Sequence, residues 1–164
     1  MNKSSIASIL MSLGEIFINI KDHSGQKIGS IFAQHYPKMN RIQIAISDFG
    51  VGIPETVKRR FVAANDNEAI LKAVEYGFST QSTPQNRGVG LTTLISNVVK
   101  NNMGSMAIHS GRGAIQFELT NKEISAKSIL TKANFQQFYP GTLFSVILRT
   151  DTIEKLADEE EFAW

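Results

Sequence analysis

The sequence predicts a single α+β domain, because segments of helical periodicity alternate with pairs of strand-like segments in a chain that is long enough for one core. A chain of 164 residues supports one ordinary hydrophobic core and is short for two. Several segments place apolar residues at steps of three and four, and two strand pairs are joined by short turns. We therefore expect helices packed on a β-sheet.

The composition favours a soluble, cytoplasmic protein. Hydrophobic residues make up 42% of the chain and charged residues 20%, which is typical of globular domains rather than of disordered segments. We find no membrane-length apolar run and no signal-peptide pattern after Met1. With no Cys, the chain forms no disulfide and no cysteine metal site.

Charge divides the chain into a domain at 1–150 and an acidic tail at 151–164. The tail holds six acidic residues and one Lys, a net charge of −5, which leaves +7 on the rest of a chain whose total is +2. Most basic residues are scattered, and the triplet Lys58-Arg59-Arg60 is more typical of a solvated helix face than of a nucleic-acid patch. We expect no nucleic-acid partner.

The first predicted helix runs from about Ser4 to His23. Its apolar face consists of Ile6, Ile9, Leu10, Leu13, Phe17 and Ile20. Glu15, Asn19 and His23 recur at steps of four and form a polar stripe beside that face. Such a stripe is ordinarily the solvent side of a helix, and a functional row is the alternative.

A hairpin follows, with strands at 28–36 and 42–47 joined by a turn at 37–40. Asp48 emerges at the end of the second strand, where alternation directs its side chain towards a cleft. Gly50 and Gly52 come next, and they let the backbone turn sharply and a flat ligand approach closely. The alternative is an ordinary strand-to-helix loop that happens to contain an acid and two glycines.

Two short helices are expected after Pro54, at 55–63 and 68–76, and Asn65-Asp66-Asn67 caps the second. The aperiodic, polar segment 77–86 predicts a mobile surface loop. Arg87-Gly88-Val89-Gly90 then opens a helix at 91–101. A glycine pair at a helix start can offer free N–H groups to an anion, although these glycines can also be simple hinges.

The last part of the domain predicts mainly strands. Asn102-Met103-Gly104 resembles a glycine helix stop, and segments 105–109 and 114–119 form a second hairpin. Residues 120–138 are ambiguous, with a helix over part of them. We expect Phe135, Phe138 and Tyr139 to pack into the core, and Pro140-Gly141-Thr142 to turn into a final strand at 143–149. The two strand histidines, His35 and His109, are expected to be ordinary surface or edge residues.

Four of these features occur in an order that resembles the GHKL ATPases. They are Glu15-x-x-x-Asn19, Asp48-x-Gly50-x-Gly52-Ile53-Pro54, Arg87-Gly88-x-Gly90-Leu91 and Gly141-Thr142-x-Phe144. The resemblance covers about Leu13 to Leu148 and is strongest to the histidine kinase branch. It implies the Bergerat fold: a two-layer α+β sandwich whose mixed, mostly antiparallel sheet is covered on one face by helices, including the one that carries Glu15.

The resemblance also implies ATP and Mg²⁺ as cofactors and gives each site residue a role. Asp48 accepts the adenine amino proton, Asn19 binds Mg²⁺, and Glu15 orients a metal-bound or attacking water. Thr142 helps to hold water and adenine. The other implied nucleotide-binding residues are Gly50, Gly52, Ile53, Arg87, Gly88, Val89, Gly90 and Leu91. Arg87 is equally well explained as a surface residue, and His23 as a structural one.

Two departures from the family shape the expected function. Glu15 follows Met1 by only fourteen residues, which leaves no room for a phosphoacceptor hairpin or for a strand before the first helix. We therefore expect an ATPase or the catalytic part of a signalling kinase that acts on a protein partner, the phosphoacceptor lying in another chain or a further segment. The alternative is a nucleotide-gated interaction module with little or no turnover.

Overall fold

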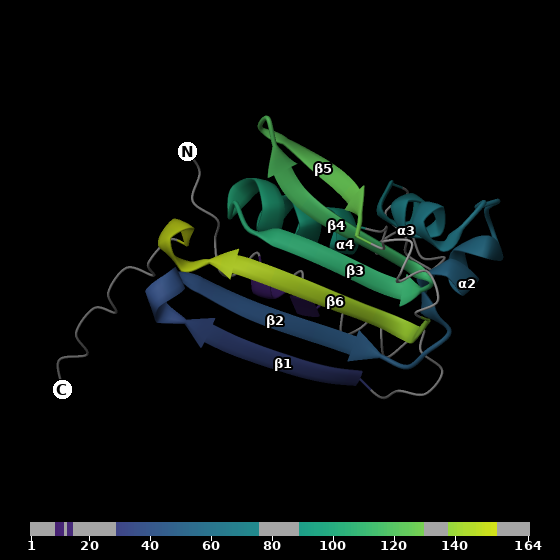
Figure 1. Ribbon diagram of the computed structural model, residues 1–164, viewed down its shortest axis with the longest axis horizontal. Coiled ribbons are helices and arrows are strands. Elements are labelled where there is room, and N and C mark those ends of the chain that lie inside the picture. The colour runs from purple at the N-terminus through teal and green to yellow at the C-terminus, as the bar shows by residue number, and fades with distance from the viewer. Residues whose placement is uncertain (1–8, 12, 15–28, 76–88, 130–137, 154–164) are drawn as a thin grey trace.

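The computed structural model describes residues 9–11, 13–14, 29–75, 89–129 and 138–153 (Figure 1). Their centre is a sheet of six strands, which in chain order are β1 (Gly29–Tyr36), β2 (Arg41–Asp48), β3 (Ser105–Gly111), β4 (Gly113–Thr120), β5 (Glu123–Ser128) and β6 (Tyr139–Arg149). The strand order in the sheet is β1-β2-β6-β3-β4-β5. Every neighbouring pair is antiparallel.

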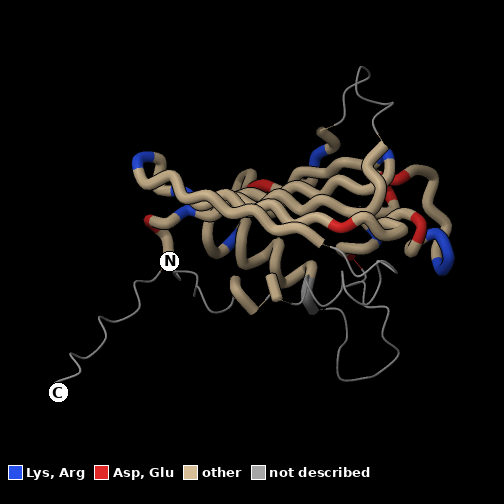
Figure 2. The backbone as a smooth tube through the Cα atoms, turned by 90° about the horizontal axis from the view of Figure 1, so that it is seen from below, with Lys and Arg blue, Asp and Glu red and all other residues tan. Residues whose placement is uncertain are grey.

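The helices lie on one face of this sheet, so the described residues form two layers (Figures 1 and 2). They are α2 (Gly52–Lys58), α3 (Asp66–Glu75), α4 (Val89–Ile95) and the π-helical η3 (Ser96–Asn101) that continues α4. Short 3-10 turns are η1 (Pro37–Met39) and η5 (Thr150–Thr152). The predicted two-layer α+β architecture is confirmed, and the sheet is antiparallel throughout the described residues.

The core lies between the two layers and follows the register of the sheet. Ile46 faces Phe144 across β2 and β6, and Phe144 faces Ile108 across β6 and β3. These side chains share one face, because directly paired residues point to the same side. The helical side of the core includes Leu94, Ile95, Val98 and Val99 together with Ile9 and Leu13. Ile9 and Leu13 are helical and buried, as their spacing predicts, whereas Leu10, predicted on the same apolar face, is 59% exposed.

The loop before α3 caps that helix and ties it to the sheet. The Asn65 carboxamide oxygen accepts the Glu68 N–H, and the Glu68 carboxylate accepts the Ala64 N–H, which satisfies two donors at the helix start. Asp66 reaches further: it binds the Lys58 amino group on α2 at 2.6 Å and accepts the Arg112 N–H at 2.8 Å. The predicted capping cluster is confirmed, and it also joins α2 and α3 to the β3–β4 turn.

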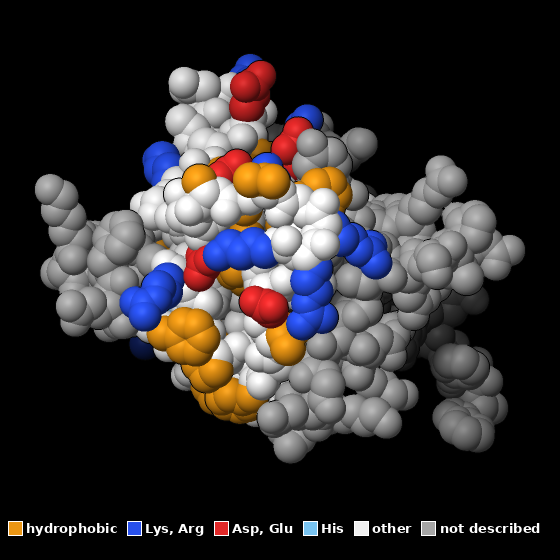
Figure 3. All heavy atoms as spheres, turned by 90° about the vertical axis from the view of Figure 1, so that its right-hand side faces the viewer, with side chains coloured by type: hydrophobic (Ala, Val, Ile, Leu, Met, Phe, Trp, Pro, Cys, Tyr) orange, Lys and Arg blue, Asp and Glu red, His pale blue; other side chains and the backbone are white. Residues whose placement is uncertain are grey.

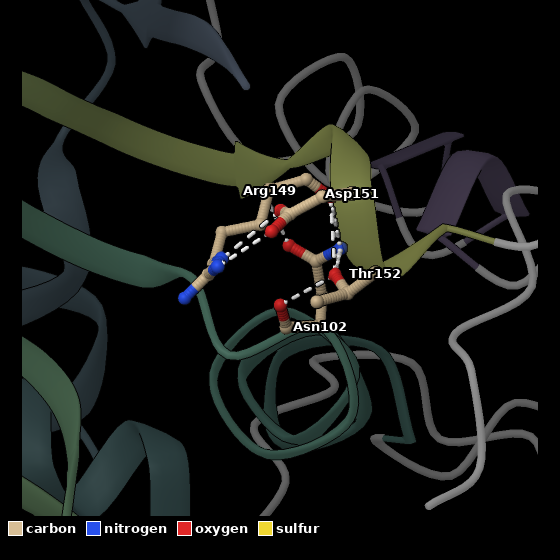
Figure 4. Close-up of polar contacts among 4 residues, drawn as sticks. All are labelled: Asn102, Arg149, Asp151 and Thr152. Atoms are coloured by element: carbon tan, nitrogen blue, oxygen red, sulfur yellow. Dashed lines mark hydrogen bonds and ion pairs between the residues drawn. The ribbon is translucent and has the colours of Figure 1, made fainter. Parts of the chain in front are cut away.

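Asn102 ends η3 and fixes it to the last strand (Figure 4). Its fully buried carboxamide accepts the Arg149 N–H and donates to the Arg149 carbonyl and to the Thr152 hydroxyl. The helix stop itself differs from the prediction, because Met103 and not Gly104 has positive φ. Gly104 is required for another reason: a Cβ there would overlap the Ile147 carbonyl oxygen.

In the ambiguous segment 120–138, residues 123–128 form the strand β5, and residues 130–137 lie outside the described residues. Two further predictions need correction. Phe138 is 63% exposed and does not pack into the core. The helix predicted at 55–63 starts at Gly52 and ends at Lys58.

Other sequence-based predictions fall outside the described residues. These are the loop at 77–86, Phe135, and most of the first helix. None of the helices in the described ranges is long and apolar enough to cross a membrane.

Candidate functional site

A row of polar side chains crosses three neighbouring strands at one end of the helix-covered face. Asp48 on β2 pairs with Thr142 on β6, and Thr142 pairs with Ser110 on β3. All three are buried, with exposed fractions of 6%, 4% and 0%. The row continues the apolar core row of Ile46, Phe144 and Ile108 one pleat further along. Buried polar groups in this position require either internal hydrogen bonds or a ligand.

The Asp48 carboxylate is held in place by the loop that follows it. Its Oδ1 accepts the Gly50 N–H at 2.7 Å, a turn that aspartate forms readily with the residue two positions on. Burial raises the pKa of Asp48, and hydrogen bonds from the Gly50 and Thr142 N–H groups oppose that rise. A carboxylate has about four lone-pair sites, so Asp48 retains the capacity to accept a further donor.

Ser110 joins the strand row to the start of α2. Its hydroxyl accepts the Ile53 N–H at 3.0 Å and donates to the Gly141 carbonyl at 2.6 Å. It also lies 3.1 Å from the Thr142 hydroxyl oxygen. Because Ser110 has one proton and gives it to Gly141, Thr142 is the donor of this third bond. The Thr142 oxygen is then left with its lone pairs to accept.

Two glycines allow these segments to approach one another. Gly52 has φ +78°, and a Cβ on it would lie 2.8 Å from the Ser110 hydroxyl oxygen and 2.9 Å from the Gly141 carbonyl oxygen. Gly141 has φ +83°, and its Cβ would overlap the Asp48 backbone and stand 2.8 Å from Oδ1. Both positions combine left-handed backbone with a lack of space, which restricts them to glycine.

The turn predicted at Pro140-Gly141-Thr142 is a bulge inside β6. Ser110 pairs with Thr142, whereas the next residue of β3, Gly111, pairs with Tyr139, so Pro140 and Gly141 are extra residues on β6. Bulges of this type use glycine with positive φ and redirect the strand. Here the bulge brings the Gly141 carbonyl to Ser110 and the Thr142 N–H to Asp48.

Gly50 and Gly52 contribute differently from one another. Positive φ occurs at Gly52, as well as at Gly111 and Gly141, but not at Gly50. Gly50 instead supplies the N–H that binds Asp48. The prediction that a sharp glycine turn follows Asp48 therefore holds, and the residue with left-handed backbone is Gly52, not Gly50.

An aromatic group lies beside the site on the other face of the sheet. Phe49 stacks on Tyr139 with 6.5 Å between ring centroids, and the His109 ring lies 5.4 Å from that of Tyr139. Burial lowers the pKa of His109, which favours the neutral ring. His109 is therefore packed against an aromatic ring, in contrast to the ordinary surface position predicted for it.

The described residues bring together only part of the predicted site. The predicted residues that converge where β2 ends and β6 begins are Asp48, Gly50, Gly52, Ile53 and Thr142. Val89 and Gly90 begin α4, and Leu91 packs against the core cluster. Glu15, Asn19, Arg87 and Gly88 lie outside the described residues. Within the described ranges, no group of three or more His, Cys, Asp or Glu side chains could hold a metal ion.

Ser110 is a site residue that the sequence motifs do not reveal. A signal for it exists, because Ser110 continues the alternation of Met106 and Ile108 as a polar residue directly before a glycine. The predicted strand ends at His109 and therefore leaves Ser110 out.

The end of the molecule that carries α2, the last residues of β2 and the first residues of β6 faces the viewer in Figure 3, where acidic and basic side chains lie close together. The ion pairs there include Lys58 with Asp66 and Arg59 with Glu55. Burial opposes ionisation of Asp66, but hydrogen bonds from Lys58 and the Arg112 N–H outweigh it and lower the pKa of that carboxyl. This cluster is internally paired, in contrast to Asp48.

Comparisons with known proteins give limited information. No family model matches the sequence, and a search of curated proteins finds no match. Among solved structures, the fold is similar to the crystal structure of the B-subunit of the DNA gyrase from Myxococcus xanthus, with 8% sequence identity and a TM-score of 0.46. The match covers 92% of this chain and 40% of that one. A similarity at this level carries no argument about function, which therefore depends on the site residues.

Proposed function

We propose that this domain binds Mg-ATP as a Bergerat-fold protein of the GHKL type, nearest to the histidine kinase branch. The observation that carries the proposal is the buried row Asp48, Thr142 and Ser110, with Gly52 and Gly141 packed around it. A desolvated carboxylate with spare acceptor capacity is suited to the exocyclic amino group of adenine. Gly52 and Gly141 let the loop after β2 and the β6 bulge pack against this row, which holds the Asp48 carboxylate in a fixed position for such a donor.

The remaining parts of the nucleotide are assigned by motif. Gly88, Val89, Gly90 and Leu91, with Arg87 before them, would face the phosphates, and Asn19 would hold Mg²⁺ with its amide oxygen. Bound Mg²⁺ supplies charge neutralisation between phosphate oxygens. Support for the helix that carries Glu15 and Asn19 comes from Ile9 and Leu13, which are buried in the core on the expected face.

Calorimetric titration with Mg-ATP tests the binding proposal. Asp48→Asn keeps an oxygen for the Gly50 N–H but presents an amino group where the adenine amino group would donate, so we expect a large loss of affinity. Each bond lost to a charged group corresponds to about 1.5–3 kcal/mol. Asp151→Asn is the matched control, since Asp151 pairs with Arg149 at the opposite end of β6.

The same titration with GTP separates base recognition from general weakening. Guanine carries a carbonyl oxygen in place of the adenine amino group, so the wild type should prefer ATP and Asp48→Asn should narrow that preference. Equal ATP affinity in wild type and Asp48→Asn, or no binding to either, would contradict the assignment.

We further propose that the domain moves or hydrolyses the γ-phosphate, with Glu15 orienting the attacking water or the acceptor. Phosphate release by wild type and Glu15→Ala, together with transfer of radiolabelled phosphate to candidate protein partners, tests this step. ATP binding with no Glu15-dependent release and no transfer would instead support a nucleotide-gated interaction module.

A further inference from the structure

A second concave surface lies away from the Asp48 site. It is an open groove of about 660 Å³ between α3, η3 and the β4–β5 hairpin. Ligand-binding pockets span roughly 300–1,000 Å³. Its apolar lining consists of Leu71, Val74, Ile95, Phe117, Ile124 and Ala126. Leu71 and Ile124 are 39% and 38% exposed, so the groove presents apolar surface that is open to a partner.

The charged residues of the groove are two lysines and two glutamates. Lys100 on η3 and Lys122 in the β4–β5 turn are both exposed, and neither forms an ion pair within the described residues. Glu75 and Glu123 also line the groove, which makes the lining neutral as a whole. A ligand is therefore held mainly by the apolar wall, and the two lysines offer positions for acidic groups beside it.

The C-terminal segment follows η5, which is hydrogen-bonded to the end of η3, a helical segment that lines this groove. Thr152 on η5 donates a hydrogen bond to the Asn102 carbonyl at 2.8 Å and accepts one from the Asn102 side chain (Figure 4). Asn102 follows Lys100 by two residues, and residues two apart point to different sides of a helix. The segment that follows Ile153 therefore starts on the side of η3 that faces β6 and has to pass the end of η3 to reach Lys100.

Residues 154–164 combine an acidic run with aromatic side chains. Four consecutive acids, Asp158 to Glu161, are followed directly by Phe162-Ala163-Trp164. Residues 151–164 carry a net charge of −5, against +7 on the rest of the chain. Eleven extended residues span up to about 36 Å, whereas the six residues of η3 cover roughly 9 Å. The segment is therefore long enough to pass the end of η3 and reach the groove.

We propose that residues 154–164 bind back onto this groove of their own chain. Phe162 and Trp164 contact the apolar wall, and the acidic run lies beside Lys100 and Lys122. Burial of the two aromatic side chains supplies most of the affinity, because exposed ion pairs contribute little. Covalent attachment helps as well, since it replaces a bimolecular encounter with a high effective concentration.

Trp164 is the single Trp of the chain, so its fluorescence in the full-length protein reports on this segment directly. We expect its emission to be shifted to the blue, and its quenching by acrylamide to be weaker, relative to a free peptide of residues 154–164. Both effects should be independent of protein concentration. Phe162→Ser alters the segment without touching the body, and it should shift the emission back towards that of the peptide.

The charge-reversal variant Lys100→Glu/Lys122→Glu turns the neutral lining of the groove acidic and repels the acidic run, so it should shift the emission in the same direction as Phe162→Ser. Arg59→Glu/Arg60→Glu, with an equal change in net charge on and just after α2, should leave the emission unchanged. Emission equal to that of the free peptide would overturn the proposal. A shift that the groove variant leaves intact would place the segment elsewhere, and a shift that grows with concentration would mean that it binds a second copy.

Discussion

Gly141 packs against Asp48 so closely that a Cβ on Gly141 would stand 2.8 Å from the carboxylate oxygen Oδ1 and overlap the backbone of the same residue. The two residues belong to neighbouring strands, and the contact depends on the bulge that places Gly141 at φ +83°. The glycine is therefore required by space and by backbone conformation together.

Gly141→Ala should destabilise the fold and displace Asp48. Left-handed backbone at a non-glycine residue costs about 1–3 kcal/mol, and the overlap adds to it. We expect a lower urea midpoint and a loss of ATP affinity larger than the loss of stability explains. Gly14→Ala is the matched control, since a Cβ on Gly14 would meet no described atom within 4 Å outside its own helix, and it should be neutral or stabilising because alanine favours a helix over glycine. Unchanged stability of Gly141→Ala would contradict the close packing.

Ser110→Ala removes the hydroxyl that joins α2, β3 and β6. The Ile53 N–H loses its acceptor and the Gly141 carbonyl its donor, and each buried group left unpaired costs about 1–3 kcal/mol. We expect a reduced free energy of unfolding by denaturant titration and weaker ATP binding, because Thr142 loses its partner. Ser145→Ala, an exposed position on β6 on the opposite face of the sheet, should change neither quantity.

The pH dependence of stability should carry a contribution from Asp48 of known sign. Burial raises the pKa of its carboxyl in the folded state above the ordinary value of 3.8, so the folded protein binds the proton more tightly than the unfolded chain. Stability from this group is present at low pH and falls as pH rises from about 3.8 through the folded-state pKa. Asp48→Asn lacks the charge and should lose less stability over that range.

ATP affinity should change in the opposite direction from stability. The ionised carboxylate is the better acceptor for an amino group, so binding should weaken as pH falls through the raised pKa of Asp48. Calorimetry across this range, with Asp48→Asn for comparison, measures the effect. Stability and affinity that rise together with pH would show that Asp48 does not control both.

Asn102→Ala should be among the most destabilising substitutions outside the site. The fully buried side chain satisfies both backbone groups of Arg149 and the Thr152 hydroxyl. Loss of this side chain leaves at least two buried groups without a hydrogen-bond partner, and each costs about 1–3 kcal/mol of stability. Asn101→Ala, one residue earlier and exposed, removes a bond to Asn97 and serves as the control for helix propensity. A small effect for Asn102→Ala would mean that water replaces the carboxamide.

Hydropathy patterns predict most of the described elements, because alternation and helical periodicity are set by which face is buried. Both hairpins and the helix after Gly90 follow directly from this. The strand β5 is not predicted because it is an edge strand whose residues are mostly exposed, so its sequence has only a weak alternation of apolar and polar residues. The prediction that Phe138 packs into the core is wrong. Aromatic residues are buried on average, but whether a particular one is buried depends on its position in the fold.

At the site, local motifs identify Asp48 and Thr142 but not the links between them. Ser110, the β6 bulge and the Gly141 contact depend on pairing between segments that are distant in the chain. Register between such segments has no short-range signature in the sequence. The roles assigned to Glu15, Asn19, Arg87 and Gly88 stay predictions.

The position of β6 has a consequence for how the protein is made. This strand is the last of the six in the chain, yet it lies between β2 and β3 in the sheet. A nascent chain that has not yet emerged beyond Tyr139 can form the β1–β2 and β3–β4 hairpins but not the pairing that joins them. Asp48 and Ser110 come together when β6 inserts between those hairpins, so the site cannot be completed before β6 has been synthesised.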